Sequence, residues 1–184
     1  SGFGQFNYHF IKALAKQPTK GIKFILHAKN LKGLKSEFGS KFLYKRYRSV
    51  SRHRPFRIKS KYDLWHSLNQ NIKIEPFFDI PYLLTVHDIH FMTEGSSLLQ
   101  MKLKAKFKEK LNRSNAIVYI SEFSKKDTHD NFDVPNVPEY VIHNGNTITD
   151  INIPENYKPA TVSNRPYLFS IGDFSIRKNF ISLV

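Results

Sequence analysis

Four short apolar runs in this sequence each end in polar residues of types that bind substrates or carry out chemistry. The runs cover residues 82–86, 116–120, 139–142 and 167–171, and they are followed by His87-Asp88, Ser121-Glu122, His143-Asn144-Gly145 and Gly172. Short runs rich in Val, Ile and Tyr predict strands that are buried on both faces. Strands that alternate with helices indicate a parallel sheet, in which ligands bind at the carboxyl ends of the strands. The sequence therefore predicts one polar site assembled from several strand ends.

His87, Asp88 and His90 form the first of these motifs, and three interpretations of it stay open. A histidine beside a carboxylate suits acid–base chemistry or the orientation of a sugar hydroxyl. His and Asp are also common metal ligands, but adjacent residues of an extended segment point to opposite faces, and no third ligand follows at a usual spacing. The third interpretation is a structural histidine held by hydrogen bonds.

Three further motifs have weaker signals. Gly2-x-Gly4 at the start of a helix suits either a phosphate approaching the helix N-terminus or a tight turn that needs positive φ. Arg177-Lys178-Asn179 suits either a clamp for a diphosphate or a solvated basic turn. Asn144-Gly145 is first of all a turn signal.

The net charge of +14 is concentrated in the first third of the chain. Residues 1–61 contain sixteen Lys or Arg and one acid, Glu37, and residues 41–61 contain no acid at all. Such a block attracts phospholipid headgroups, nucleic acid or phosphorylated substrates, or it is simply a solvated basic loop. Tyr44, Tyr47 and Phe56 interleave with the charges, which suits single-strand nucleic-acid binding or an interfacial membrane segment.

The remaining segments predict an α/β chain. We expect helices from Phe3 to Leu14, from Leu98 to Asn112 and from Glu122 to Asn131, the last with Ser121 as its N-cap, and additional strands at residues 23–27 and 62–66. Leu99, Leu103, Phe107 and Leu111 give the lysine-rich second helix an apolar stripe, which either packs on the sheet or contacts a membrane. Residues 1–150 form the first domain, residues 151–165 a linker, and residues 166–184 the start of a second domain. Because no strand precedes the first helix and the last strand has no sheet, we expect a fragment of a longer protein.

Cysteine is absent from the sequence, and no apolar stretch approaches the ~20 residues that cross a bilayer. Disulfides, thiolate catalysis and zinc ribbons are thereby excluded, and a reducing compartment is favoured. The expected location is cytoplasmic.

Taken together, the motifs resemble those of retaining glycosyltransferase family 4, whose members have the two-Rossmann-domain GT-B fold, and in particular the mannosyltransferase-like branch that builds surface polysaccharides. The resemblance covers almost the whole chain. Its six blocks, in the family's order, are Gly2-Phe3-Gly4-Gln5-Phe6, Asp63-Leu64-Trp65-His66-Ser67, Pro81 to Ile89, Ala116 to Lys125, Val141-Ile142-His143-Asn144-Gly145, and Tyr167 to Gly172 with Arg177-Lys178-Asn179.

This resemblance implies transfer of a sugar from a nucleotide-diphosphate donor to an acceptor hydroxyl, with retention and without a metal or other cofactor. His87 and Asp88 would serve the reacting centre, and Ser121, Glu122, Asn144 and Gly145 would shape the cleft for a glycan or lipid-linked acceptor. The donor phosphates would meet Gly2, Gly4, Arg177 and Lys178, where positive charge stabilises the leaving diphosphate. Residues 41–61 and 101–113 would contact an anionic membrane at its inner face.

One departure from the family limits the expected activity, because the acidic E-x-x-x-x-x-x-x-E pair that holds the donor is absent from this sequence. We therefore expect the chain alone to have no transferase activity. Two other classes stay open: a basic module that binds nucleic acid through residues 41–61, and a small flavodoxin-like ligand-binding domain. The glycosyltransferase interpretation expects no nucleic-acid partner.

Overall fold

The structure of the chain, a computed structural model, describes residues 2–19, 21–92, 96–146, 172 and 179–183. The chain divides into two units, Ser1–Thr147 and Ile148–Val184. The described part of the second unit contains one short 3-10 helix, Phe180–Leu183. The predicted strand 167–171 lies outside the described residues, as does most of the predicted linker and second domain.

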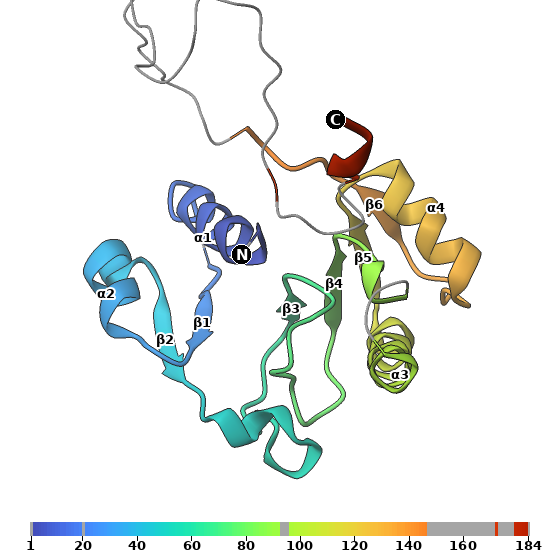
Figure 1. The fold of residues 1–184 in the computed structure, drawn as a ribbon. Helices are drawn as coiled ribbons and strands as arrows, with labels where there is room; N and C mark the ends of the chain where they lie inside the picture. The colour runs from blue at the N-terminus through green and yellow to red at the C-terminus, as the bar shows by residue number, and fades with distance from the viewer. Residues whose placement is uncertain (1, 20, 93–95, 147–171, 173–178, 184) are drawn as a thin grey trace, which may run out of the picture. The chain divides into compact units, whose positions relative to one another are not determined.

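Four parallel strands form the larger sheet of the first unit, in the order β3-β4-β5-β6 (Figure 1). The strands are β3 (Trp65–Ser67), β4 (Tyr82–Val86), β5 (Ala116–Tyr119) and β6 (Glu139–Val141). Each neighbouring pair is parallel, with Leu84 of β4 opposite Ile117 of β5. The carboxyl ends of these strands therefore meet at one edge of the sheet, as the sequence predicts.

A second, two-stranded sheet pairs β1 (Ile25–Ala28) with β2 (Leu43–Arg46), also in parallel. Helix α2 (Lys32–Phe38) connects the two strands, so this part of the basic segment forms a β-α-β unit. The sequence pattern indicated neither α2 nor β2. The reason is that β2 (Leu-Tyr-Lys-Arg) lacks an apolar face and is mostly exposed, so its pairing with β1 rather than its own pattern makes it a strand.

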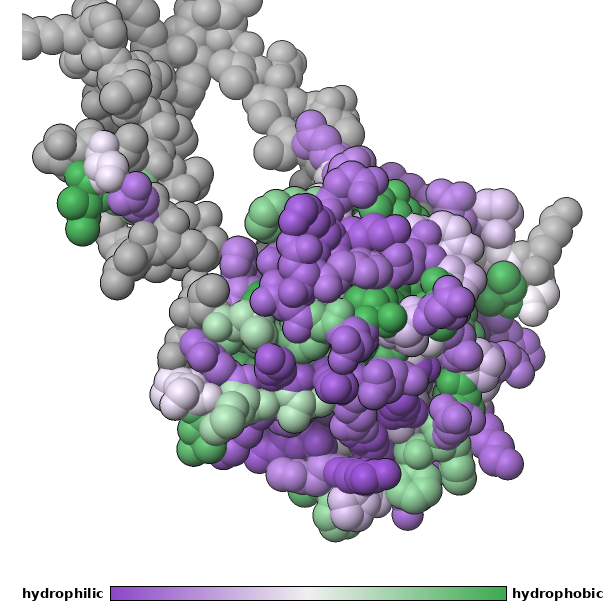
Figure 2. Space-filling model, turned by 90° about the vertical axis from the view of Figure 1, so that its right-hand side faces the viewer, coloured by the Kyte–Doolittle hydropathy of each residue, from purple (hydrophilic) through white to green (hydrophobic). Residues whose placement is uncertain are grey.

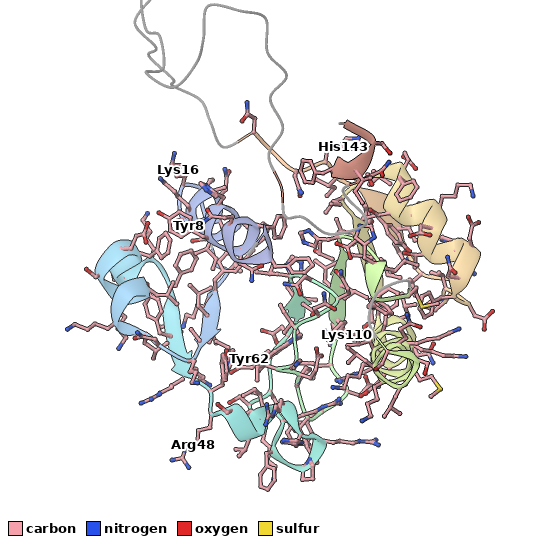
Figure 3. All side chains as sticks on the ribbon, in the orientation of Figure 1. Tyr8, Lys16, Arg48, Tyr62, Lys110 and His143 are labelled. Atoms are coloured by element: carbon pink, nitrogen blue, oxygen red, sulfur yellow. The ribbon has the colours of Figure 1, made fainter. Side chains whose placement is uncertain are left out.

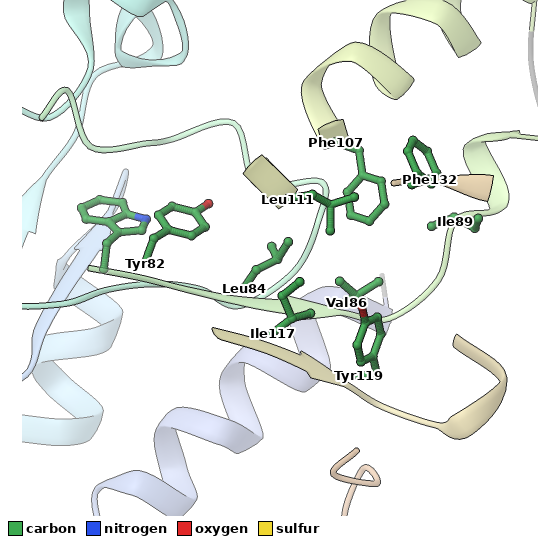
Figure 4. Packing of buried hydrophobic residues seen from close by; sticks show 10 residues of the cluster. Tyr82, Leu84, Val86, Ile89, Phe107, Leu111, Ile117, Tyr119 and Phe132 are labelled. Atoms are coloured by element: carbon green, nitrogen blue, oxygen red, sulfur yellow. The ribbon is translucent and has the colours of Figure 1, made fainter. Parts of the chain in front are cut away.

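Three helices cover the larger sheet. Helix α1 (Gly2–Leu14) lies on one face, and α3 (Ser97–Arg113) lies on the other (Figures 1 and 4). Helix α4 (Glu122–Asn131) follows β5, and Phe132 at its end packs edge-to-face on Phe107 of α3 with ring centroids 4.8 Å apart. The fold is therefore α/β, with a Rossmann-like parallel sheet flanked by helices.

The apolar core lies between the larger sheet and α3. Its fully buried members come from two strands and one helix: Tyr82, Leu84, Val86, Ile117, Tyr119, Phe107 and Leu111 (Figure 4). These side chains alternate along the strands and recur at helical spacing in α3, as an amphipathic pattern requires. Their burial fixes the sheet on which the strand-end residues stand.

Most predicted elements are present, with small shifts at their ends. The predictions for β4 and α4 match the structure residue for residue, and α3 is longer by one residue at each end. By contrast, β3 begins at Trp65 rather than at Tyr62, because Trp65 pairs with Tyr82, the first residue of β4, and the preceding residue of that strand partner is Pro81, which has no backbone N–H to donate. Strand β1 likewise begins two residues later than expected, at Ile25.

Candidate functional site

His87 follows the last residue of β4 and is held by groups from distant parts of the chain. Its Nε2 lies 3.1 Å from the carbonyl oxygen of Leu68, and its backbone N–H donates to Gln70 Oε1 at 3.1 Å. Its own carbonyl oxygen accepts a hydrogen bond from Ser124 Oγ at 2.6 Å. The residue is 7% exposed. Both its backbone and its ring are therefore fixed by hydrogen bonds at the strand end.

These contacts define the protonation state of the His87 ring. A carbonyl oxygen only accepts, so Nε2 carries the proton that is shared with Leu68. Burial lowers the pKa of His87, and this effect outweighs the opposing effects of the Leu68 carbonyl and of Asp88. At neutral pH the ring is therefore uncharged, with Nδ1 as an acceptor. Such a ring suits hydrogen bonding to a ligand hydroxyl better than donation of a proton.

Two aromatic residues of α1 cover the His87 ring. The ring centroid of Phe6 lies 4.4 Å from that of His87, and the centroid of Phe3 lies 5.1 Å away, both edge-to-face. A spacing of three residues brings both rings to one side only in a helix. The predicted turn at Gly2-Phe3-Gly4 is therefore corrected, because α1 already includes Gly2 and both glycines lie in its first turn.

Asp88 is half-buried beside His87 and is oriented by a residue that the sequence did not single out. Its Oδ1 accepts from Gln70 Nε2 at 3.3 Å and from the backbone N–H of His90 at 3.3 Å. Gln70 is 4% exposed and thus hydrogen-bonds to both His87 and Asp88. The only sequence signal for Gln70 is its place three residues after β3, at the same edge of the sheet. His90 itself is exposed and lies in a short 3-10 helix, His90–Met92.

Ser121 connects the end of β5 to the same network. As the N-cap of α4, its side chain accepts from the backbone N–H of Ser124 at 3.1 Å, and the two hydroxyl oxygens lie 2.9 Å apart. Ser124, in turn, donates to the carbonyl of His87. Ser121 thus acts as the predicted helix cap and joins the strand ends through Ser124. Glu122 next to it is exposed.

Asn144 and Gly145 follow β6 and are both exposed. The predicted tight turn is wrong, because no turn forms at these two residues and Gly145 does not adopt a positive φ. The chain instead continues beyond β6, where the N–H of Ile142 donates to the carbonyl of Tyr119 at 2.9 Å. Arg177 and Lys178, the predicted diphosphate clamp, lie outside the described residues.

The described residues contain no group of three or more His, Asp or Glu side chains that could hold a metal ion. The absence of a metal from the reaction stays a prediction.

The basic block at residues 41–61 is partly structural. Lys45 donates to Ser60 Oγ at 3.1 Å and lies over the ring of Tyr62, and Tyr44 donates to the carbonyl of Gly39 at 2.9 Å. Phe56 is the most exposed of the three interleaved aromatic residues, at 59%. The block is therefore not one continuous stacking surface for nucleic-acid bases.

Helix α3 has a mixed surface. Leu98, Leu99 and Met101 are exposed near its start. The face that carries α3 and α4 is mostly hydrophilic with separate apolar patches (Figure 2). Among the described residues, no helix is long and apolar enough to cross a membrane.

Comparison of the chain with protein-family models, with curated proteins and with solved structures found no match. The candidate site is therefore defined by its own geometry. It consists of the neutral His87, Asp88 held by Gln70, and the first turn of α1, all at the carboxyl end of β4.

Proposed function

We propose that this chain is the acceptor-side half of a glycosyltransferase that uses a nucleotide-diphosphate sugar and retains the anomeric configuration. The observation that carries the proposal is the contact of Phe3 and Phe6, in the first two turns of α1, with His87. More than eighty residues separate these two segments in the sequence. The motifs predict donor-phosphate contacts at the first segment and contacts with the transferred sugar at the second, so their proximity in the structure supports a shared site.

The proposed roles follow from the geometry of each group. The first backbone N–H groups of α1 have no partner within the helix, so they favour the negative charge of donor phosphates. His87 is neutral, and its Nδ1 accepts a hydrogen bond from a hydroxyl of the transferred sugar. Asp88 and Gln70 hold the segment after β4 in place. For Arg177 and Lys178, which lie outside the described residues, the role comes from the family resemblance alone, which assigns them to neutralise the leaving diphosphate.

The decisive experiment uses the whole protein that the gene encodes. It is incubated with a panel of nucleotide-diphosphate sugars and glycan or lipid-linked acceptors, and release of the nucleoside diphosphate is measured. The variant His87→Gln keeps an amide donor for the Leu68 carbonyl but removes the ring. We expect its kcat/KM to fall by about 10²-fold, because the transferred sugar, without its hydrogen bond to the ring, is no longer aligned with the acceptor hydroxyl.

The matched control is His129→Gln. His129 lies at the end of α4 and is hydrogen-bonded to Glu139, the first residue of β6, so it is at the opposite edge of the sheet. We expect this variant to retain full turnover. Equal losses in both variants, or no transfer with any donor, would contradict the proposal. Nucleic-acid binding that weakens steeply with salt and survives loss of His87 would favour the alternative of a basic nucleic-acid-binding module instead.

The chain of 184 residues is also tested alone in the same assay. We expect neither transfer nor donor hydrolysis, since the acidic pair that holds the donor is absent. Measurable turnover by this chain would contradict the proposal that a second domain, carrying the acidic pair, is needed to bind the donor.

A further inference from the structure

A hollow of about 280 Å³ lies beside α3, and its lining includes Gln70, the residue that hydrogen-bonds to His87 and Asp88. Four parts of the chain line it: residues 52–57 with their 3-10 turns, the loop 70–75 between β3 and β4, Phe91, and the half of α3 from Leu103 to Arg113. His87 and α1 do not contribute to its lining. Its volume is near the lower end of small-molecule sites, so it accommodates a compact group rather than a long chain.

The lining has a large excess of positive charge. It includes seven lysines and arginines and only two glutamates, Glu75 and Glu109. Each glutamate is already paired, Glu75 with Lys110 at 2.8 Å and Glu109 with Arg57 at 2.7 Å. In the part of the chain that the structure describes, none of the other five cations forms an ion pair. Like charges this close repel one another, so an anion in the hollow would relieve the repulsion.

Several of the cations are held rigidly. Both terminal nitrogens of Arg113 donate to the carbonyl of Pro76 at 3.4 Å, and one also donates to the carbonyl of Phe78 at 3.0 Å. Lys110 donates to Ser67 Oγ at 3.1 Å and to the carbonyl of Ile72 at 2.7 Å (Figure 3). Because their side chains are already ordered, little further entropy is lost when a ligand binds.

Arg57, one of the residues that line the hollow, has an unsatisfied donor. Its side chain is 13% exposed, and one terminal nitrogen donates to Glu109. Its Nε is buried and, among the described residues, has no acceptor. A buried guanidinium N–H without a partner costs free energy, so an acceptor oxygen at this position is favourable.

From this arrangement we propose that the hollow beside α3 is a second binding site, which takes a phosphate or diphosphate group. Arginine forks match the oxygens of phosphate, and several cations around one small hollow suit its multiple charge. Phe91, Leu103 and Phe107 add apolar wall, which accommodates the first carbons of an ester. A soluble phosphate ester and a lipid headgroup share this chemistry, and the experiment separates them.

The test uses the chain with Arg54 and Lys106 both changed to Gln. Both residues line the hollow, are exposed and form no ion pair in the described part of the chain, so the change spares the fold. Pyrophosphate is titrated calorimetrically at constant ionic strength without divalent cations. In a second arm, sedimentation measures binding to phosphatidylcholine vesicles with and without phosphatidic acid.

The matched control changes Arg48 and Lys102 to Gln, which removes the same charge from the basic block 41–61 and from α3 at positions that do not line the hollow. Arg48 points away from the molecule (Figure 3), and Lys102 is exposed on α3. We expect the R54Q/K106Q variant to lose about tenfold or more in affinity, and the control less than twofold. Loss in the pyrophosphate arm identifies a soluble ester, and loss in the vesicle arm alone identifies a headgroup. No binding in either arm, or equal losses in both variants, overturns the proposal.

Discussion

His87 is held by residues from three separate parts of the chain: the first turn of α1, the segment after β3, and the start of α4. Burial keeps the ring uncharged and these contacts orient it, so it is not a mobile acid. Of the sequence alternatives, sugar orientation and a structural role both fit this environment, and proton donation fits it least. Assays of His87→Gln separate the first two.

The first prediction at the residue scale concerns Gly2→Ala. In the structure Gly2 is helical, and a Cβ built on it would meet no atom within 4 Å. We therefore expect the free energy of unfolding to stay the same or to rise by about 0.5 kcal/mol, because alanine restricts the unfolded chain. Urea denaturation followed by circular dichroism measures the change.

Gly21→Ala is the control for that prediction. Gly21 has a φ of 76°, which L-residues rarely adopt, although a Cβ there would also meet open space. We expect this variant to lose about 1 kcal/mol from backbone strain alone. If Gly2→Ala lost as much as Gly21→Ala, Gly2 would belong to a turn that needs glycine, and the helical start of α1 would be wrong.

At the scale of the element, α3 uses only part of its apolar stripe for the core. Phe107 and Leu111 are 1% and 0% exposed, whereas Leu99 near the start of the helix is 48% exposed. The periodicity predicted the helix and its stripe but not this division. Burial depends on how far the sheet extends beneath the helix, and that is a property of the packed strands.

The prediction for α3 is a difference between two identical substitutions. Leu111→Ala removes a side chain that is buried against the core of the larger sheet, so we expect a loss of about 2–5 kcal/mol in the free energy of unfolding. Leu99→Ala changes an exposed side chain on the same helix, and we expect a change within about 0.5 kcal/mol. Chemical denaturation of both variants measures this difference, and equal losses would mean that α3 is buried along its whole length.

At the scale of the whole first unit, two half-buried histidines, His27 and His66, lie where β1 and α1 meet the larger sheet. The ring centroid of His27 in β1 lies 5.3 Å from that of Trp65 in β3. His66 of β3 is hydrogen-bonded to Thr85 Oγ1 at 2.9 Å, and its ring centroid lies 5.5 Å from that of Phe10 in α1. Burial lowers the pKa of both histidines to about 4, and the charge of Lys45 adds to the effect at His27.

These lowered pKa values predict a loss of stability in mild acid. Between a folded pKa of about 4 and an unfolded pKa of about 6.5, the unfolded chain binds more protons, so stability decreases as pH falls through this window. His66 alone contributes on the order of 3 kcal/mol of this loss when the window is crossed completely. Urea unfolding at pH 7.5, 6 and 5, followed by the emission of the single tryptophan, Trp65, measures the slope.

The variant His66→Gln tests the origin of that slope. Glutamine keeps a hydrogen-bonding group for Thr85 but does not titrate, so we expect a flatter dependence of stability on pH. His53→Gln, which changes an exposed histidine, is expected to keep the slope of the unchanged chain. An unchanged slope in His66→Gln would show that burial of this ring does not cause the acid sensitivity.

The sequence by itself determined the strands and helices whose patterns are local. Apolar runs that end in polar residues identified β4 and β5, and a helix cap at Ser121 identified the start of α4, because these signals lie within a few neighbouring residues. It also singled out His87 and Asp88, since residues that directly follow a buried strand lie at the ligand-binding edge of a parallel sheet.

Only the tertiary structure decided the features that depend on distant segments. Gln70 orients His87 and Asp88 because β3 and β4 are neighbours, and β2 is a strand because β1 pairs with it. Likewise, the basic hollow exists because residues 52–57 fold against α3, where Arg57 meets Glu109. Contacts between residues far apart in sequence do not produce a local pattern of apolar and polar residues, so they cannot be predicted from such a pattern.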